Sequence, residues 1–207
     1  MKSFLILLVV LLSVVAANSA MLRVASDGSA PFTVIQTAIN AASARDTILV
    51  CPGNYVGFTV DRRLVVIGSG TGILSGEGAK VSGIVEINDA ADSTELRSLW
   101  IRGSVTDGNT DSLAAIVRIH SGAVGVFVWR CFVEVTYNPN YCGAAWSGNG
   151  TIVQYSQCTF WYTAGFDGNE FAVGVRPNSD ISLMSCVASN LRNFVRSYSG
   201  YRHFVWK

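Results

Sequence analysis

The chain opens on a continuous apolar stretch and then changes pattern. Residues 4–15 are apolar apart from Ser13, follow the basic Lys2 and precede several small residues. An apolar stretch of that length is too short to cross a bilayer comfortably, and its flanks are typical of a secretory signal. We therefore expect residues 1–20 to be a signal peptide, residues 21–207 to form the mature domain, and the protein to be secreted and extracellular.

Helical periodicity occurs once, early in the expected mature domain. Apolar residues recur there at the i, i+3, i+4 and i+7 spacing of one helical face, namely Ile35, Ala38, Ile39 and Ala42. This spacing predicts a short amphipathic helix over residues 33–44. Beyond it, short β-branched runs are separated by Gly and Asn, which is the pattern of strands and turns. The sequence therefore predicts an all-β domain with one helix at its front.

An eight-residue pattern recurs along the second half of the chain. Its copies are TELRSLWI (94–101), VFVWRCFV (126–133), VQYSQCTF (153–160) and ISLMSCVA (181–188). The first, third, sixth and eighth positions are mostly apolar or small, so the alternation changes phase once within each copy. Two strands joined by a sharp bend would give this pattern, because one extra residue at the bend lets both strands point inward.

Units of this size must stack to be stable. One unit cannot bury its apolar side alone, whereas stacked units build a continuous core. We therefore predict a solenoid whose strands pair in parallel with the coils above and below. Independent hairpins are disfavoured, because the Asn-Gly turn at 149–150 lies between copies and not inside one.

The segment that contains the predicted helix resembles a known family. In PFTVIQTAINAASARDTILVCPGNYV, the matching stretches are Val34-Ile35-Gln36, Ala38-Ile39, Asp46-Thr47-Ile48 and Pro52-Gly53-Asn54-Tyr55. They resemble the entry segment of pectin-lyase-like right-handed parallel β-helix proteins, although Arg45 stands where Gly is usual, and LVVIGSG (64–70) is similar to that family's second coil.

The resemblance implies a single-stranded right-handed parallel β-helix with a short N-terminal capping helix. It also implies polysaccharide as the substrate class. It leaves the activity open, since the superfamily includes lyases, hydrolases, esterases, phage tailspikes, adhesins and inactive members.

The residues that these enzymes use are not found as a set. The stretch 175–180 has the Arg176 and Asp180 of a lyase-like site without a surrounding aspartate cluster. Asp107 and Asp111 could pair as in a hydrolase, but the Asp-Asp and Gly-His-Gly elements of polygalacturonases are missing, so we interpret them as a polar turn. The catalytic residues stay unknown and no cofactor is expected, with Ca²⁺ expected only for a lyase.

The outward positions of the repeats carry large aromatic residues. Stacking predicts Trp100 beside Phe132 and Arg102 beside Glu134, with Trp161 next in the second column. Sugar rings stack on outward aromatic side chains, so the carbohydrate-binding candidates are Trp100, Arg102, Trp129, Phe132, Glu134 and Trp161. Alternatively, this face is covered by the chain's own loops or by a second subunit, in a homo-oligomer formed through the aromatic face or the C-terminal edge.

Three of the five cysteines fall on one inward position of successive copies. Cys131, Cys158 and Cys186 are spaced compatibly with disulfides, but we favour a buried column of free thiols. Cys51 and Cys142 have no evident partner. Because the cysteine spacing fits no zinc pattern, no metal site is expected.

Charge and motif content limit the partners. Without Lys2, the chain has 14 basic and 14 acidic residues, which argues against nucleic acid as a partner. No later stretch is apolar and long enough to span a membrane, so no membrane association is expected after signal cleavage. Asn149-Gly150-Thr151 is a glycosylation sequon.

The sequence therefore favours a secreted β-helix protein that binds polysaccharide without its family's usual catalytic residues. Two alternatives stay open. One is an active polysaccharide lyase or glycoside hydrolase with a divergent site, and the other is a structural or adhesive surface protein.

Overall fold

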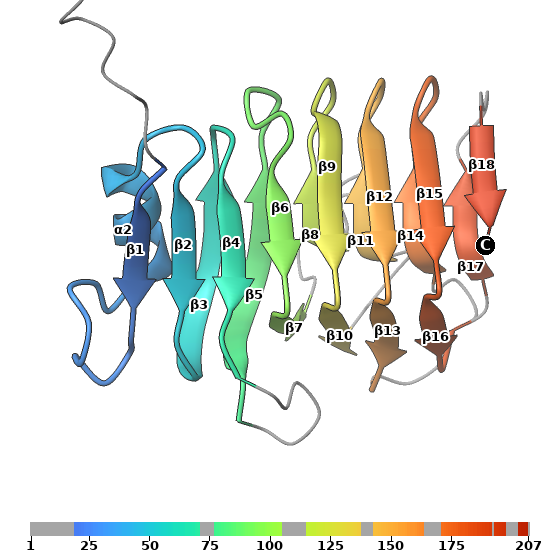
Figure 1. Cartoon of the computed structure of the whole chain (residues 1–207). Coiled ribbons are helices and arrows are strands. Elements are labelled where there is room, and N and C mark those ends of the chain that lie inside the picture. The colour runs from blue at the N-terminus through green and yellow to red at the C-terminus, as the bar shows by residue number, and fades with distance from the viewer. Residues whose placement is uncertain are drawn as a thin grey trace, which may run out of the picture.

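The protein is a right-handed parallel β-helix that is closed at its N-terminal end by one helix (Figure 1). The computed structural model describes residues 19–70, 77–104, 115–137, 143–163, 171–191, 193–197 and 203–206. Every strand pairing in this part of the chain is parallel, which confirms the predicted all-β solenoid. The expected signal peptide lies almost wholly outside the described residues, so secretion stays a prediction.

Eight strands form the front sheet, which faces the viewer in Figure 1. In spatial order they are β1 (Met21–Val24), β2 (Thr47–Val50), β4 (Val65–Gly68), β6 (Glu95–Arg97), β9 (Val124–Trp129), β12 (Ile152–Ser156), β15 (Asp180–Met184) and β18 (His203–Trp206).

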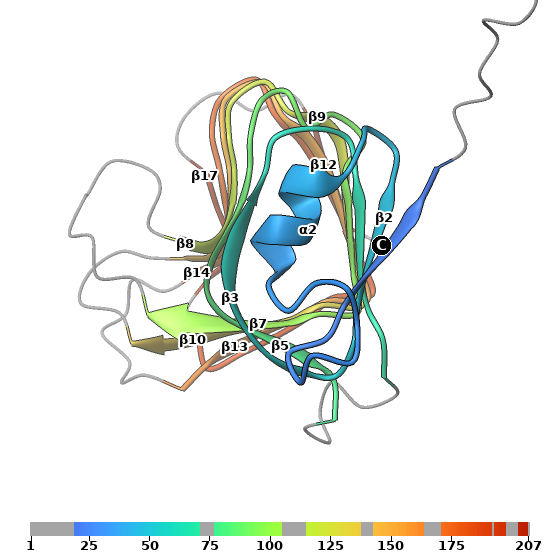
Figure 2. The same cartoon turned by 90° about the vertical axis from the view of Figure 1, so that its left-hand side faces the viewer.

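The second sheet has ten strands and wraps around the other two sides of the coil (Figure 2). The long strands β3 (Gly53–Val60) and β5 (Ala79–Ile87) belong to the early coils. From β5 the sheet divides into a lower arm and a rear arm. The lower arm contains β7 (Trp100–Ser104), β10 (Phe132–Tyr137), β13 (Thr159–Tyr162) and β16 (Val187–Ser189). The rear arm contains β8 (Ala115–Ile119), β11 (Gly143–Ser147), β14 (Phe171–Val175) and β17 (Asn193–Ser197).

A single residue makes each bend from the front sheet to the lower arm. Ser98, Arg130, Gln157 and Ser185 occupy these bends, and each has a φ between 51° and 53°. This left-handed conformation turns the chain sharply and adds one residue between the two strands, which confirms the predicted change of phase. None of the four is the Gly or Asn that usually adopts it, so the stacked coils on either side hold these residues in place.

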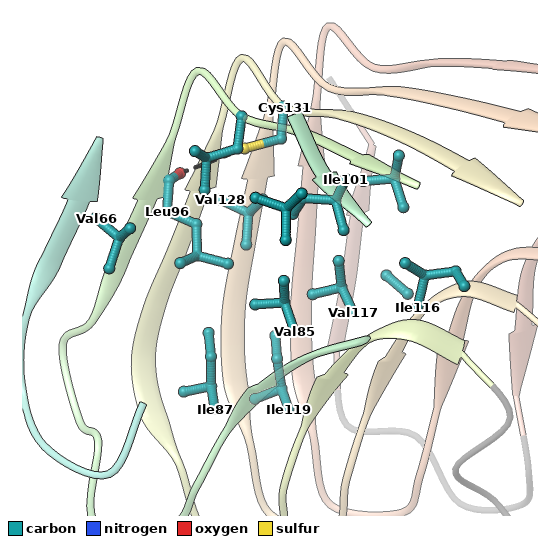
Figure 3. Close-up of a cluster of buried hydrophobic side chains, with 14 of the residues drawn as sticks. Val66, Val85, Ile87, Leu96, Ile101, Ile116, Val117, Ile119, Val128 and Cys131 are labelled. Carbon is teal, nitrogen blue, oxygen red and sulfur yellow. Dashed lines mark hydrogen bonds between the residues drawn. The ribbon is translucent and has the colours of Figure 1, made fainter. Parts of the chain in front are cut away.

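The core consists of inward columns that run through the coils. Along the front sheet, Val66, Leu96, Val128, Tyr155 and Leu183 stack in register and are buried. Figure 3 shows part of this column together with inward residues of the rear arm. Each buried aliphatic side chain contributes about 1.5–3 kcal/mol, and it is buried mostly by the coils next to it.

The helix α2 (Ile35–Ala41) is shorter than the predicted 33–44. Val34 and Ala42 are both extended, and Val34 has no side-chain oxygen with which to cap the first turn. Its apolar face is buried against β1, β2 and β3, and the helix lies across the open end of the coil (Figure 2). The helix therefore covers the N-terminal end of the core, as predicted.

Candidate functional site

The register of the lower arm brings five of the six candidate residues onto one face. Trp100 pairs with Phe132, while Arg102 pairs with Glu134 and Glu134 with Trp161, as the repeat predicts. Lys80 on β5 precedes Trp100 in the same column. We call Lys80, Trp100, Arg102, Phe132 and Glu134 the Trp100 cluster.

Glu134 holds the Trp100 cluster together. Its side chain faces outward but the residue is only 7% exposed, because its neighbours cover it. Trp100 Nε1 donates to Glu134 Oε2 at 3.0 Å, and Arg102 Nε lies 3.5 Å from the same oxygen. Thr163 Oγ1 donates to Glu134 Oε1 at 3.4 Å. Both carboxylate oxygens are therefore engaged within the protein.

The indole ring of Trp100 is also occupied by its neighbours. Lys80 Nζ lies 4.9 Å from the ring centroid and Arg102 Cζ lies 5.9 Å from it. The ring of Phe132 meets the indole edge-to-face, with the centroids 5.7 Å apart. A sugar could stack on this indole only by displacing these contacts. The register was predictable, but the mutual engagement of these side chains was not.

Trp129 lies apart from the other candidates, on the front sheet and across the Arg130 bend from Phe132. Arg97 Cζ and Arg130 Cζ lie 5.6 Å and 4.8 Å from its ring centroid. Its Nε1 donates to Gln157 Oε1 at 3.1 Å. Trp129 therefore belongs to a second aromatic surface, in which Arg97 also pairs with Glu95.

The front sheet carries a groove next to Trp129. The groove has a volume of about 240 Å³ and crosses β9, β12 and β15. Its outward side chains are Phe127, Ile152, Gln154, Asp180 and Ser182. Phe127, Gln154 and Ser182 are in register and hold the second position of three successive repeats. This second position is the sequence signal that could have located the groove.

The groove combines apolar surface with incompletely satisfied polar groups. Ile152 is 46% exposed, which is unusual for a large aliphatic side chain. Asp180 Oδ1 is buried and has no hydrogen-bond partner among the described residues. Gln154 Nε2 donates to Met184 Sδ at 3.1 Å, and a thioether is a weak acceptor. A ligand hydroxyl could therefore give the Gln154 amide a stronger acceptor than this thioether.

A second concavity, of about 420 Å³, lies where the rear arm turns toward the front sheet. Its lining includes His120, Trp146, Asn149 and Arg176. Arg176 Cζ lies 5.5 Å from the Trp146 ring centroid, and His120 Nε2 lies 3.9 Å from Glu86 Oε1.

These positions separate Arg176 and Asp180, which the sequence analysis considered together for a lyase-like site. Arg176 lines the second concavity, whereas Asp180 lines the front groove, so the two lyase-like candidates do not share a site. The turn that follows β14 separates them and leads the chain from the rear arm to the front sheet. Asn149 is exposed in the turn between β11 and β12, and its glycosylation stays a prediction.

Some expectations fall outside the described residues, namely those on Asp107, Asp111 and Cys142. Within the described ranges, no group of three or more His, Cys, Asp or Glu side chains could hold a metal ion. No helix in the same ranges is long and apolar enough to cross a membrane.

Comparison with solved structures identifies the fold. A putative glycosyl hydrolase from Parabacteroides merdae superposes with a TM-score of 0.59 at 11% identity, covering 83% of this chain and 86% of that chain. The chain shares the parallel β-helix fold of that protein. A pectin methylesterase from Aspergillus niger aligns with a TM-score of 0.41 at 12% identity, over 90% of this chain and 86% of that chain. No known sequence family and no curated protein matches the chain. The likeness to the Parabacteroides merdae protein identifies a fold and not an activity.

Proposed function

We propose that the protein binds a polysaccharide along its front sheet, with the sugar chain crossing β9, β12 and β15. The front groove carries this proposal, because apolar side chains lie there beside a carboxylate, an amide and a hydroxyl that face outward. Sugar rings present apolar C–H faces and polar hydroxyl edges, and the groove offers a partner for each.

The coil spacing suits a chain of repeating units. Neighbouring strands lie ~4.8 Å apart, which is close to the length of one pyranose unit in an extended glycan. Phe127, Gln154 and Ser182 repeat at this spacing along the groove. Successive sugar units would therefore meet successive coils in equivalent positions.

Trp129 extends the surface beyond the groove. It lies two residues after Phe127 on the same face of β9, and Arg97 and Arg130 flank its ring. Arg97 is engaged by Glu95, so Arg130 is the guanidinium group that would meet the carboxylate of an acidic sugar at this end of the surface. The Trp100 cluster plays no part in the proposed binding, since its polar groups engage one another.

A glycan array probed with the full chain tests the function, and affinity measurements on variants test the site. Phe127→Ala and Asp180→Asn should each weaken binding about tenfold, as is usual for a central contact. Arg176→Ala in the second concavity is the matched control and should leave binding unchanged. Loss of binding in Arg176→Ala alone would contradict the front-sheet site. An array without bound glycan would contradict the function, and release of cleaved sugar would contradict binding without catalysis.

A further inference from the structure

The inward cysteines form a ladder of thiols that follows the bends. Cys131, Cys158 and Cys186 each come directly after a bend residue and occupy the same position in successive coils. Their thiols donate to the carbonyl oxygens of Leu96, Val128 and Tyr155, one coil earlier, at 3.7, 3.3 and 3.5 Å. Figure 3 shows the contact between Cys131 and Leu96. All three cysteines are free thiols, as predicted, but the predicted burial holds only for Cys131 and Cys158.

The three thiols differ in accessibility. Cys131 and Cys158 are each 1% exposed, whereas Cys186 is only partly buried. An oxidant in solution could therefore reach Cys186 first.

Cys158 and Cys186 are also placed for a covalent bond. They hold equivalent positions after the bends of adjacent coils, and Val187 N donates to Cys158 O at 2.9 Å, which fixes the register beside them. Adjacent strands lie ~4.8 Å apart, which is within the range of roughly 4.4–6.8 Å between the Cα atoms of a disulfide.

Electrostatics separates the roles of the thiols. Burial raises the pKa of Cys131 to about 12 and also raises the pKa of Cys158. The neighbouring Cys158 thiol, by contrast, lowers the pKa of Cys186 to about 7. Since the thiolate is the nucleophile in thiol–disulfide exchange, Cys186 is the attacking group and Cys158 the resolving group.

We propose that Cys158 and Cys186 form a redox-active pair that a low-molecular-weight disulfide oxidises to an intramolecular disulfide, while Cys131 stays a free thiol. The Cys186 thiolate attacks one sulfur of the oxidant, forms a mixed disulfide and releases one thiolate. Cys158 then gives its proton to the released thiolate, attacks the Cys186 sulfur and expels the second thiolate, which takes up the proton that Cys186 gave to the solvent. The protein loses two protons and two electrons, and the oxidant is reduced to two thiols.

The bond would fasten one coil to the next. It would join the bend between β12 and β13 to the bend between β15 and β16, two parts of the chain that only non-covalent contacts now connect. A crosslink between coils lowers the entropy of the unfolded chain, so the oxidised protein should unfold at a higher denaturant concentration than the reduced protein.

The test uses the full chain, first reduced and then incubated with oxidised glutathione. Peptide mass spectrometry should find Cys158 joined to Cys186, and the joined peptides should weigh two hydrogen atoms less than the free ones. Cys131→Ser should still form this crosslink. Cys158→Ser should stop at a glutathione adduct on Cys186, and Cys186→Ser should form no crosslink. A Cys131–Cys158 crosslink, or adducts alone in the unsubstituted chain, would overturn the proposal.

A rate measurement adds a readout that does not depend on stability. Alkylation of Cys186 by iodoacetamide in the reduced protein should reach half its maximal rate near pH 7. An ordinary thiol does so near its usual pKa of about 8.5. A half-maximal rate at the ordinary value would remove Cys186 as the attacking group.

Discussion

The lower arm and the front sheet both direct aromatic side chains outward, yet the two surfaces use them differently. In the Trp100 cluster, Glu134 engages Trp100 and Arg102, and Lys80 lies over the indole ring. On the front sheet, Asp180 lines an open groove with one oxygen lacking a partner among the described residues. A side chain that points outward is therefore not necessarily available to a ligand.

Under the proposed function, the first surface stabilises the fold and the second binds the ligand. A satisfied network of buried charge and aromatic contacts stabilises the coils that it joins, and removing one member leaves the others unpaired. A polar group in a groove that lacks a hydrogen-bond partner destabilises the fold. Binding of a ligand that supplies the partner offsets this loss. Substitutions at five positions test this distinction.

The largest effect is expected for Glu134→Ala. Trp100 Nε1 and Arg102 would lose their shared acceptor, so the free energy of unfolding should fall by about 2–3 kcal/mol. Urea unfolding of the full chain measures this change. Glu134→Gln keeps an acceptor and should lose less. Unchanged stability together with lost glycan binding would show that the cluster is a ligand site.

A pair of tryptophan substitutions compares the two surfaces directly. Trp100→Ala removes the centre of the cluster and should cost about 2 kcal/mol, below the usual cost for a fully buried aromatic residue. Trp129→Ala should cost less than about 1 kcal/mol but weaken glycan binding about tenfold. Thermal unfolding and affinity measurements on both variants check this. The reverse ranking in both measurements would contradict the assignment of the surfaces.

Asp180→Asn should behave as a change to a binding group. Removing a poorly satisfied carboxylate should leave stability unchanged or raise it by up to about 1 kcal/mol, while affinity falls. Urea unfolding in the absence of glycan provides the measurement. A clear loss of stability would mean that Asp180 serves the fold.

The smallest effect is expected for Arg130→Ala. Arg130 lies over the Trp129 ring and its Nε donates to Gln157 Oε1 at 2.9 Å, and these exposed contacts together contribute about 0.5–1 kcal/mol. The left-handed backbone at this bend is retained, since Ala and Arg tolerate it about equally. A loss of stability no larger than these contacts contribute, measured in the same urea series, would support the view that Trp129 is an accessible side chain.

The repeat in the sequence predicted the register but not the engagement of individual groups. The inward and outward positions follow from the alternation within each copy, so the pairing of Trp100 with Phe132 could be derived. Lys80 lies on β5, outside the four copies of the eight-residue pattern. Its contact with Trp100 therefore could not be predicted.

Asp180 in the groove and the ends of the helix show two further limits of prediction from the sequence. Asp180 lies one residue before the fourth copy of the repeat, so the pattern assigned it no position. At the helix, periodicity alone extended the prediction past Ala42, where the backbone already becomes extended to lead into β2. Hydrophobic spacing identifies which faces are buried, whereas the ends of elements and the depth of grooves depend on contacts between coils.

Because the coils stack in register, the number of coils sets the length of the front surface. Because each coil contacts mainly its two neighbours, duplicating one repeat of 28 residues, such as 153–180, would add a rung to the front sheet without altering the cross-section. The front surface would lengthen by ~4.8 Å, about one more sugar unit. Lengths of glycan could therefore be matched by the number of coils, with the chemistry of each contact left unchanged.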